Sequence, residues 1–242
     1  ATLGKTIDIH AGGQDLQFPH HENEIAQSEC AHGEPLARFW LHNGFLDIES
    51  EKMSKSIGNV KIPHEMLKST KGEVLRMALM AGQYRQPLDW TEELLDAVKT
   101  TLDRAYGALR RVWKSGSARW NDKAVFEALC DDLNTPQALA EFSRLISEAN
   151  IAADHNDKEA MAVARANLIE AGDLLGLLQS TPDEWEKGGA SDDTARIDAL
   201  VQERLDARAA KNWARADEIR DELAAEGVEI MDGSGGSSWR KV

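Results

Sequence analysis

The sequence predicts an α/β segment first, then an antiparallel helical bundle, and finally a small mixed α/β unit. Three observations lead to this prediction. A β-like run, a glycine pair and a helix follow one another within residues 6–30; apolar residues then recur at steps of three and four; and Gly188-Gly189 interrupts that pattern. With 242 residues, 42% of them hydrophobic, the chain has room for roughly one large domain or two to three small ones.

The first segment reads as strand, loop, helix and further strand. Residues 6–10 are typical of a strand, and Gly12-Gly13 predicts a turn after it. A helix is expected over residues 18–30, opening at Pro19. The apolar runs at residues 39–41 and 45–48 predict another strand or a hairpin edge before a polar loop at residues 49–59.

The middle of the chain has helical periodicity. One apolar face, from Leu94 to Trp113, predicts a helix of about 20 residues. Thr135-Pro136 supplies an N-cap and a first-turn proline for a second helix. A third amphipathic run covers residues 164–178 and stops near Pro182. Three long helices with short connections predict an antiparallel bundle.

The last part begins after the Gly-Gly linker. We expect helices over residues 194–211 and 213–226, a stop at Gly227, a strand over residues 228–231 and a final strand at Trp239-Arg240. The chain therefore divides into residues 1–62, 63–100, 101–187 and 188–242.

Charge and cysteine content limit the possible functions. The formal net charge is −14, and none of the segments carries more basic than acidic residues, so binding to a polyanion must depend on local stripes of positive charge. The sequence has no apolar run long enough for a membrane span and no signal peptide, which predicts a cytoplasmic protein without a membrane partner. Cys30 and Cys130 are expected to be reduced, small buried apolar residues.

A candidate metal site lies at the start of the first expected helix. His20 and Glu24 stand four residues apart on one helix face, close enough to bind one metal ion. Cys30 lies about 15 Å further along a continuous helix, too far to complete the site. Two ligands are half of a zinc site, and a charged helix start without metal is the alternative interpretation.

A second candidate is the pentapeptide Lys-Met-Ser-Lys-Ser at residues 52–56. A loop with two lysines, two hydroxyls and a nearby glycine can close over a triphosphate, where an ammonium group stabilises a departing pyrophosphate. A solvated lysine-rich loop is the alternative, but this pentapeptide is far rarer than such loops.

Together these motifs resemble the second half of the cysteinyl-tRNA synthetase family, which belongs to the class I aminoacyl-tRNA synthetases. The resemblance rests on residues 8–16, 18–24 and 52–56 in that order and spacing, on the acidic-Asn-Thr-Pro turn at residues 131–136, and on residues 206–240. It extends over essentially the whole chain. It implies that residues 1–62 are the end of a Rossmann-type catalytic domain, that 63–100 connect it to the bundle at 101–187, and that 188–242 bind an anticodon.

The resemblance also implies roles for individual residues. His20 and Glu24 match two zinc ligands, with two cysteines expected further upstream, and His10 matches a residue beside the amino-acid pocket. The segment that lies along the adenosine in this family matches Gly12, Gly13 and Asp15. The mobile loop that contacts the phosphates matches Lys52 and Lys55.

The implied reaction is ATP-dependent activation of cysteine and its transfer to tRNA(Cys). Zn²⁺ would accept the substrate thiolate and Mg²⁺ would bind the phosphates of ATP. The sequence lacks the His-x-Gly-His element of class I enzymes, so we expect the 242 residues to be inactive alone and to need the N-terminal half as a partner. The alternatives are a small-molecule cysteine ligase, which would lack the last domain, and a non-catalytic tRNA-binding subunit.

Candidate RNA contacts lie in the last domain. Arg204, Arg208, Lys211 and Arg215 follow at steps of four, three and four, which predicts one cationic stripe along a helix or its continuation. We also expect the rings of Trp213 and Trp239 to stack on bases. The carboxylates of Asp217 and Asp232 are expected to accept hydrogen bonds from base amino groups. Solvated surface charge is the alternative for the stripe.

Overall fold

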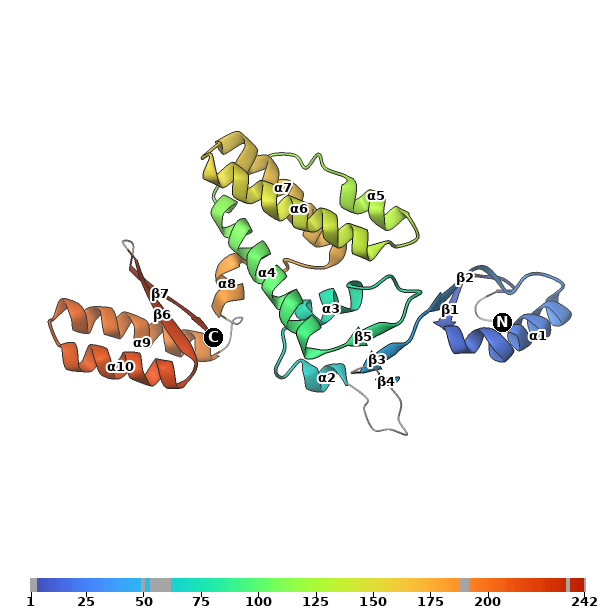
Figure 1. Cartoon of the computed structure of the whole chain (residues 1–242), viewed down its shortest axis with the longest axis horizontal. Helices are drawn as coiled ribbons and strands as arrows, with labels where there is room; N and C mark the ends of the chain where they lie inside the picture. Colours follow the sequence, from blue (N-terminus) through green and yellow to red (C-terminus); the bar gives the residue numbers. More distant parts are fainter. Residues whose placement is uncertain (1–3, 49–50, 53–61, 188–191, 234–235, 242) are drawn as a thin grey trace.

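The structure is a computed structural model that describes residues 4–48, 51–52, 62–187, 192–233 and 236–241. Three parts follow one another along its long axis (Figure 1): an N-terminal α/β part at one end, a helical part in the middle and a small α/β unit at the other end. The expected order of fold classes is therefore confirmed.

The N-terminal part is a β-α-β unit. Strand β1 (Ile7–Gly13) pairs in parallel with β2 (Ala37–Asn43), and the crossover contains two short helical turns, η1 (Gln14–Leu16) and η2 (Gln17–His21), followed by α1 (Glu22–His32). The expected turn at Gly12-Gly13 is wrong, because both glycines belong to the strand. Regular helix begins at Glu22, after η2, in which Phe18 has extended backbone angles.

Alternation along the two parallel strands gives their faces different chemistry. His10 lies opposite Trp40 in the register, and their ring centroids are 4.7 Å apart. Ile9 lies opposite Phe39, and these two side chains are 61% and 65% exposed. One face of the pair therefore carries aromatic and polar rings, and the other is apolar and open to solvent.

A second small sheet joins this part to the helices. Strand β3 (Leu46–Ile48) pairs antiparallel with β4 (Glu51–Lys52) and parallel with β5 (Leu88–Trp90), while α2 (Pro63–Met66) and α3 (Gly72–Met80) lie between β4 and β5 in sequence. Only the backbone of Lys52 is described, and Lys55 falls outside the described residues, so the structure does not place the side chains of the Lys-Met-Ser-Lys-Ser loop.

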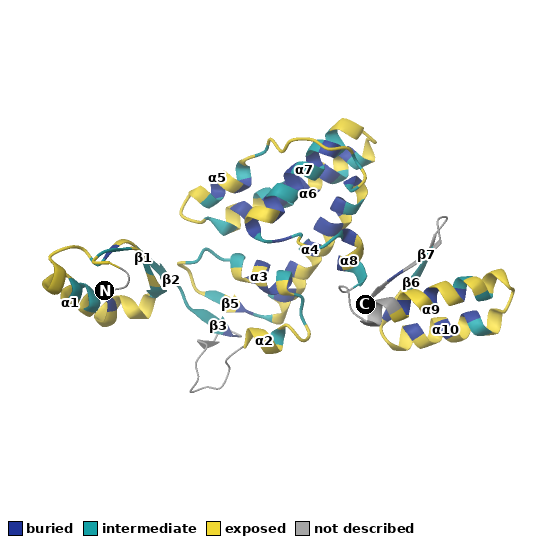
Figure 2. Cartoon of the chain, turned by 180° about the vertical axis from the view of Figure 1, so that it is seen from behind, coloured by how far each residue is buried: buried dark blue, intermediate teal, exposed yellow. Residues whose placement is uncertain are grey.

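The helical bundle contains the largest hydrophobic core. Its elements are α4 (Glu92–Val112), α5 (Ala124–Cys130), α6 (Thr135–Asp154), α7 (Lys158–Leu175) and α8 (Pro182–Lys187). Buried residues gather on α4, α6 and α7 (Figure 2), with Leu102, Phe142 and Leu168 fully covered. The same core includes Ile48 and Trp90, so residue 100, an expected domain boundary, lies inside α4 and inside one continuous core.

The ends of these helices follow the capping rules with one change. The hydroxyl of Thr91 accepts a hydrogen bond from the Leu94 amide and caps α4. Asn134, not the expected Thr135, caps α6 by accepting from the Gln137 amide, while Thr135 donates its hydroxyl to the Gly82 carbonyl. Helix α7 ends at Leu175, well before Pro182, because Gly176 takes a left-handed conformation with φ +66°.

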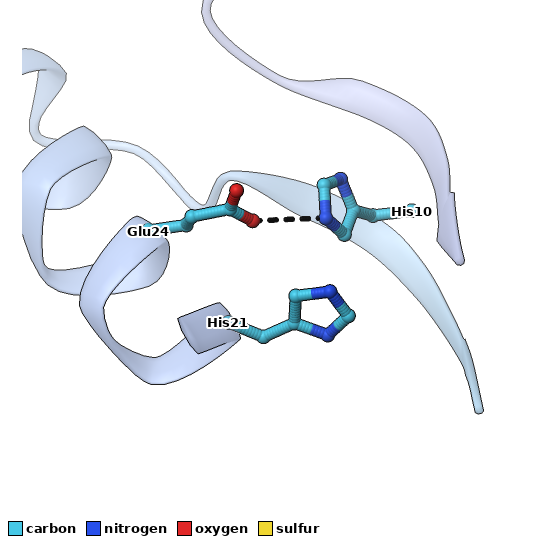
Figure 3. A group of neighbouring side chains, drawn as sticks. All are labelled: His10, His21 and Glu24. Carbon is cyan, nitrogen blue, oxygen red and sulfur yellow. Dashed lines mark ion pairs between the residues drawn. The ribbon is translucent and has the colours of Figure 1, made fainter. Parts of the chain in front are cut away.

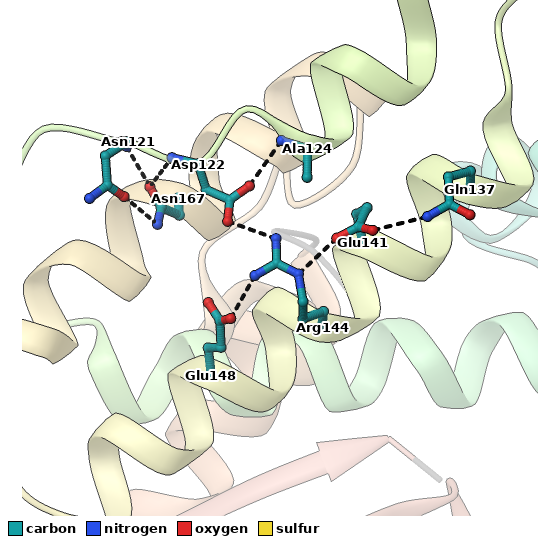
Figure 4. A network of polar contacts seen from close by, with 8 residues as sticks. All are labelled: Asn121, Asp122, Ala124, Gln137, Glu141, Arg144, Glu148 and Asn167. Atoms are coloured by element: carbon teal, nitrogen blue, oxygen red, sulfur yellow. Dashed lines mark hydrogen bonds and ion pairs between the residues drawn. The ribbon is translucent and has the colours of Figure 1, made fainter. Parts of the chain in front are cut away.

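A polar network fastens the segment before α5 to the bundle (Figure 4). Arg144 on α6 donates to Asp122, Glu141 and Glu148, at 2.6 to 2.7 Å in each case. Burial opposes ionisation of Asp122, but the Ala124 amide and the Arg144 guanidinium outweigh it and hold the pKa of this carboxyl below its ordinary value.

The C-terminal unit has its own core. Helices α9 (Asp192–Ala209) and α10 (Trp213–Ala225) pack against the hairpin of β6 (Val228–Gly233) and β7 (Gly236–Lys241), in the order predicted from the sequence. The buried residues of this small core are Ile197, Val201, Ile219, Leu223, Val228 and Trp239.

Cys30 and Cys130 are exposed rather than buried, because they fall on the solvent side of α1 and at the end of α5. Among the described helices, none combines the length and the apolar character that a bilayer crossing requires.

Candidate functional site

A cluster of histidines and one glutamate lies between β1 and α1. The ligand atoms of His10, His21 and Glu24 all fall within 4.8 Å of one another (Figure 3). His10 Nε2 is 2.9 Å from one carboxylate oxygen of Glu24, and His20 Nε2 is 3.2 Å from the other. Glu24 therefore lies between two imidazoles that come from different elements.

His21 is the buried member of this cluster. Its Nδ1 lies 2.8 Å from Nε2 of His42 on β2, so one of these rings donates its proton and the other accepts it. Burial, followed by the nearby imidazoles of His10 and His42, lowers the pKa of His21, which favours the neutral ring. A neutral imidazole is also the form that binds metal ions.

Trp40 forms a wall of the cluster. Its ring lies 4.7 Å from the His10 ring and 5.2 Å from the His21 ring, and it stacks at 6.1 Å on His42 with an interplanar angle of 10°. The indole of Trp40 therefore packs against three of the histidine rings.

Gly12 explains how His21 approaches the strand so closely. A Cβ atom at this position would lie 2.8 Å from His21 Cε1 and 3.0 Å from a Leu16 methyl group. Any larger residue would displace the imidazole. At Gly13, a Cβ would lie 2.6 Å from a carboxylate oxygen of Asp15, so this glycine allows the exposed Asp15 side chain to fold back over the strand end.

The donor set fits a zinc ion. Two ligands of a tetrahedral zinc site lie roughly 3.3 Å apart, close to the His20–Glu24 separation of 3.2 Å. The Glu24 oxygen that faces His10 is buried and lies 2.9 Å from Nε2 of that imidazole, a contact that would orient the carboxylate toward a bound metal ion. His20 and Glu24 are the pair predicted from the sequence, and the ligand atoms of His10 and His21 lie within 4.8 Å of a Glu24 oxygen.

A cavity of about 520 Å³ adjoins this cluster. His10 and Glu24 line it together with residues of the β1 start and of the α1 surface, among them Ile7, Gln27 and Ala31. A small molecule in this cavity would meet the imidazole and the carboxylate directly.

The sequence motifs point to His10, His20 and Glu24 but not to His21, His42 and Trp40. His21 stands in the same motif as His20, and only the β1–β2 pairing shows that it turns inward. Trp40 and His42 are two residues apart on β2, so a strand prediction alone would place them on the same face of the sheet.

The candidate RNA-binding residues of the C-terminal unit are only partly brought together. Arg208 and Lys211 are both exposed at the turn between α9 and α10, and Asp217 is exposed on α10. The side chain of Asp232 lies outside the described residues. The four-residue stripe is not continuous, because α9 ends at Ala209, Arg204 is buried and Arg215 binds Glu203 and Glu218.

Only one of the two tryptophans expected to offer a stacking face is exposed. Trp239 is 2% exposed and its indole N–H donates to Asp198 at 2.7 Å, so the expectation of a stacking face at Trp239 is wrong for this fold. Its ring fills the small core because β7 needs an apolar residue against α9. Trp213, at the first position of α10, is 59% exposed and offers the open aromatic face.

Comparison with known protein families gives three matches in sequence order. Residues 1–100 match the class I (C) tRNA synthetase catalytic domain, residues 124–179 match the DALR domain, and residues 191–240 match the anticodon-binding domain of cysteinyl-tRNA ligases. The first match covers the N-terminal part, the second small sheet and the start of α4, and the other two fall within the helical bundle and on the C-terminal unit.

Similar proteins and structures agree with these matches. The chain is 65% identical over 240 residues to the cysteine–tRNA ligase of Hyphomonas neptunium, covering 99% of this chain and 52% of that protein. It is 54% identical to the cysteine–tRNA ligase of Caulobacter sp. (strain K31), with 99% and 52% covered. The chain thus spans about half the length of these curated relatives.

A solved structure shows the same fold at low identity. The LeuRS–tRNA–LeuAMS ternary complex from Agrobacterium radiobacter K84 aligns with a TM-score of 0.55 and 18% identity, covering 70% of this chain and 25% of that one. From the three domain matches and the identity to these relatives it follows that the chain belongs to the cysteinyl-tRNA synthetase family, whose C-terminal half it matches.

Proposed function

We propose that this chain supplies the C-terminal half of a cysteine–tRNA ligase, which activates cysteine with ATP and transfers it to tRNA(Cys) in the cytoplasm. The observation that carries the proposal is the histidine–glutamate cluster between β1 and α1, which brings His10 and Glu24 together beside a cavity. The matched anticodon-binding domain argues against a small-molecule ligase, which would not need it.

In the first step the carboxylate of cysteine attacks the α-phosphate of ATP, and pyrophosphate leaves. Gly12 and Gly13 let the adenosine approach the backbone, and the exposed Asp15 carboxylate accepts hydrogen bonds from ribose hydroxyls. Lys52 and Lys55 would neutralise the charge that develops on the leaving pyrophosphate, and Mg²⁺ bound to ATP would supply further positive charge there.

Recognition of the amino acid falls to the cluster. His20 and Glu24 would hold zinc, which when bound supplies a soft Lewis acid for the thiolate of cysteine. His10 orients Glu24 and borders the adjoining cavity, while Trp40 and His21 pack against the His10 ring. In the second step the terminal ribose hydroxyl of tRNA attacks the activated carbonyl, and AMP leaves.

The exposed apolar face of the β1–β2 pair supports the need for a partner half. Ile9 and Phe39 lie side by side in the register and Phe18 is 77% exposed, so three large side chains of the N-terminal part face solvent. Patches of this kind mark contact surfaces. The part of the synthetase fold that precedes this segment in the longer relatives is the proposed occupant.

The test is exchange of pyrophosphate into ATP. We expect none from the 242 residues alone, and cysteine-dependent exchange when they are mixed with the first half of the Hyphomonas neptunium relative. Serine should not support the exchange. Lys55→Ala should lower the rate by roughly two orders of magnitude because it removes a positive charge that would stabilise the leaving pyrophosphate.

Lys68→Ala is the matched control, since Lys68 is an exposed lysine close in sequence that pairs with Glu65. It should leave the rate unchanged. Exchange by the chain alone would contradict the need for a partner half, and no exchange in the mixture would contradict the ligase function.

A further inference from the structure

The turn that follows α5 makes an unusual set of contacts with a distant loop. Asp132 lies in this turn, and its carboxylate accepts two hydrogen bonds from Arg85, from Nε at 2.9 Å and from Nη2 at 3.1 Å. The Tyr84 hydroxyl donates to the same carboxylate at 2.9 Å. Arg85 and Tyr84 belong to the loop between α3 and β5, residues 81–87, which we name the α3–β5 loop.

The backbone of the turn is shaped for these contacts. Asp132 and Leu133 both have positive φ angles, 51° and 53°, which residues with a side chain adopt rarely. The Asp132 backbone carbonyl accepts a hydrogen bond from the side-chain amide of Gln83 at 3.3 Å. The Thr135 hydroxyl donates to the Gly82 carbonyl at 3.1 Å. Side chains and main chain of the turn therefore hold the loop at several points.

The other side of the α3–β5 loop lies on the N-terminal part. Gly44 donates its amide to the Tyr84 carbonyl at 2.8 Å, and a Cβ at Gly44 would lie 2.4 Å from the Gln86 backbone. The Gln14 side chain donates to the Arg85 carbonyl at 2.8 Å. Gln14 stands between Gly13 and Asp15, in the segment proposed to lie along the adenosine.

These contacts form one connection from the bundle to the nucleotide segment. Asp132 holds the Arg85 side chain, and the Arg85 carbonyl holds Gln14. A bidentate arginine–carboxylate pair fixes the plane of the guanidinium as well as its distance. The Arg85 guanidinium, with the Tyr84 hydroxyl, also holds the pKa of the Asp132 carboxyl below its ordinary value, so the pair is charged at neutral pH.

We propose that Asp132 is a positioning residue for adenylate formation: through Arg85 it holds the α3–β5 loop against Gly44 and so fixes Gln14 and the segment that binds ATP. This inference rests on the proposed function. It gives the acidic turn of the bundle a role in ATP binding, although the turn contacts no residue that is proposed to touch ATP.

The exposure of the pair separates this role from a purely structural one. Both side chains are about half exposed, 50% for Arg85 and 53% for Asp132, and ion pairs of that kind contribute little to folding stability. Loss of the pair should therefore change the affinity for ATP more than it changes the melting temperature.

The kinetic test uses the complemented synthetase and the variant Asp132→Asn. We expect the KM for ATP to rise roughly threefold to tenfold, with kcat within about twofold and the KM for cysteine unchanged. Arg85→Lys should have a smaller effect in the same direction, because it keeps the charge but loses the second hydrogen bond. Combining Asp132→Ala with Arg85→Ala should be no worse than either alone.

Asp131→Asn is the matched control. Asp131 is the exposed neighbour in the same turn, and within the described residues its carboxylate has no hydrogen bond or ion pair. This variant should have wild-type KM values for ATP and cysteine. An Asp132→Asn variant with an unchanged KM for ATP, or with equal losses in KM for ATP and for cysteine, would overturn the inference.

A second readout needs no activity. In the 242-residue chain, Asp132→Asn should speed amide hydrogen exchange at Gly44 and Gln86, and in the peptide that contains Gln14, while Asp131→Asn should not. Unchanged exchange in Asp132→Asn would overturn the inference whatever the kinetics. If instead no form of the complemented chain exchanges pyrophosphate, the proposed ligase function fails, and the positioning role toward ATP fails with it.

Discussion

Asn167 is a polar side chain that is buried in the bundle and satisfied there. Its carbonyl oxygen accepts from the backbone amides of Asn121 and Asp122, at 2.8 and 3.3 Å, and its amide donates to the Asn121 side chain at 3.0 Å. One residue of α7 therefore holds the segment that leads into α5. A buried polar group with all its partners contributes little net, but removing it leaves those partners unsatisfied.

We expect Asn167→Ala to destabilise the bundle by about 1–2 kcal/mol, because two backbone amides lose their acceptor while the exposed Asn121 can regain water. Urea unfolding followed by circular dichroism measures this change. Glu170→Ala on the same helix is the control and should stay within about 0.5 kcal/mol. Equal stability of both variants would show that the segment before α5 is not held by Asn167.

Sequence patterns predict local pairs of residues better than they predict convergent ones. The i, i+4 spacing of His20 and Glu24 already places both on one helix face, and the structure brings their ligand atoms within 3.2 Å. The meeting of His21 with His42 depends on strand pairing between distant segments, which no local spacing reveals. The expectation for Trp239 is wrong for the same reason, since the core it fills is built from three other elements.

At the scale of elements, the turn between α9 and α10 carries exposed cations of the C-terminal unit. Lys211 follows the end of α9 at Ala209 and has a positive φ of 60°, a conformation common just after a helix. Arg208 lies one turn earlier, and Trp213 begins α10 with its ring exposed. Two cations and an open aromatic ring at one helical turn are suited to a phosphate backbone and an unstacked base.

We expect the Arg208→Ala and Lys211→Ala variants to bind tRNA(Cys) more weakly, and to reduce the slope of log affinity against log salt by roughly one for each phosphate that is no longer neutralised. Filter binding of the 242-residue chain at several salt concentrations measures both quantities. Arg220→Ala is a matched control, because Arg220 is an exposed cation of the same unit that pairs with Asp217 and Asp221. An unchanged salt slope in Arg208→Ala and Lys211→Ala would exclude this turn as the RNA-binding surface.

Helices are more accurately predicted than strands and caps. The apolar steps of three and four in α4 persist over 21 residues, enough to identify both the helix and its buried face. The sequence pattern predicts regular helix over most of the residues that form η2. It misses the extended backbone at Phe18, because that conformation leaves no trace in the spacing of apolar residues. At α6 two adjacent residues can both serve as N-cap, and the contact of Thr135 with Gly82 decides for Asn134.

The whole molecule contains two separate hydrophobic cores among its described residues. The larger one extends from Ile48 to Trp185, and the smaller one begins at Ile197. Lys187 at the end of α8 links them by donating to Asp198, which in turn accepts from Trp239. A unit of about 50 residues with so few buried side chains is marginally stable by itself.

We expect amide exchange to report two opening units, with residues 192–241 less protected than residues 92–175. Lys187→Ala should lower protection only in the C-terminal unit, because its ion pair with Asp198 is one of the contacts between that unit and α8. Lys99→Ala, which removes an exposed pair with Asp103 on α4, is the control and should change neither. A single cooperative unit with equal protection throughout would contradict the two-core description.

The order of the three parts could be predicted because each has its own local signature. Contacts between parts could not, because they rest on pairs such as Arg85 with Asp132 and Lys71 with the Trp185 carbonyl and ring, whose members are far apart in sequence. The expected boundary at residue 100 stays a prediction; it lies inside α4, whose buried residues belong to one continuous core.

The parallel β1–β2 pair has a consequence for how the chain behaves during synthesis. Within the described residues neither strand pairs with a third, so both outer edges present backbone amides and carbonyls as a template for additional strands. Because Ile9 and Phe39 are exposed on one face of the same pair, these edges favour pairing between copies of the chain at high concentration. The order of assembly thus matters: if these edges are covered before copies of the chain meet, the protein is protected from aggregation.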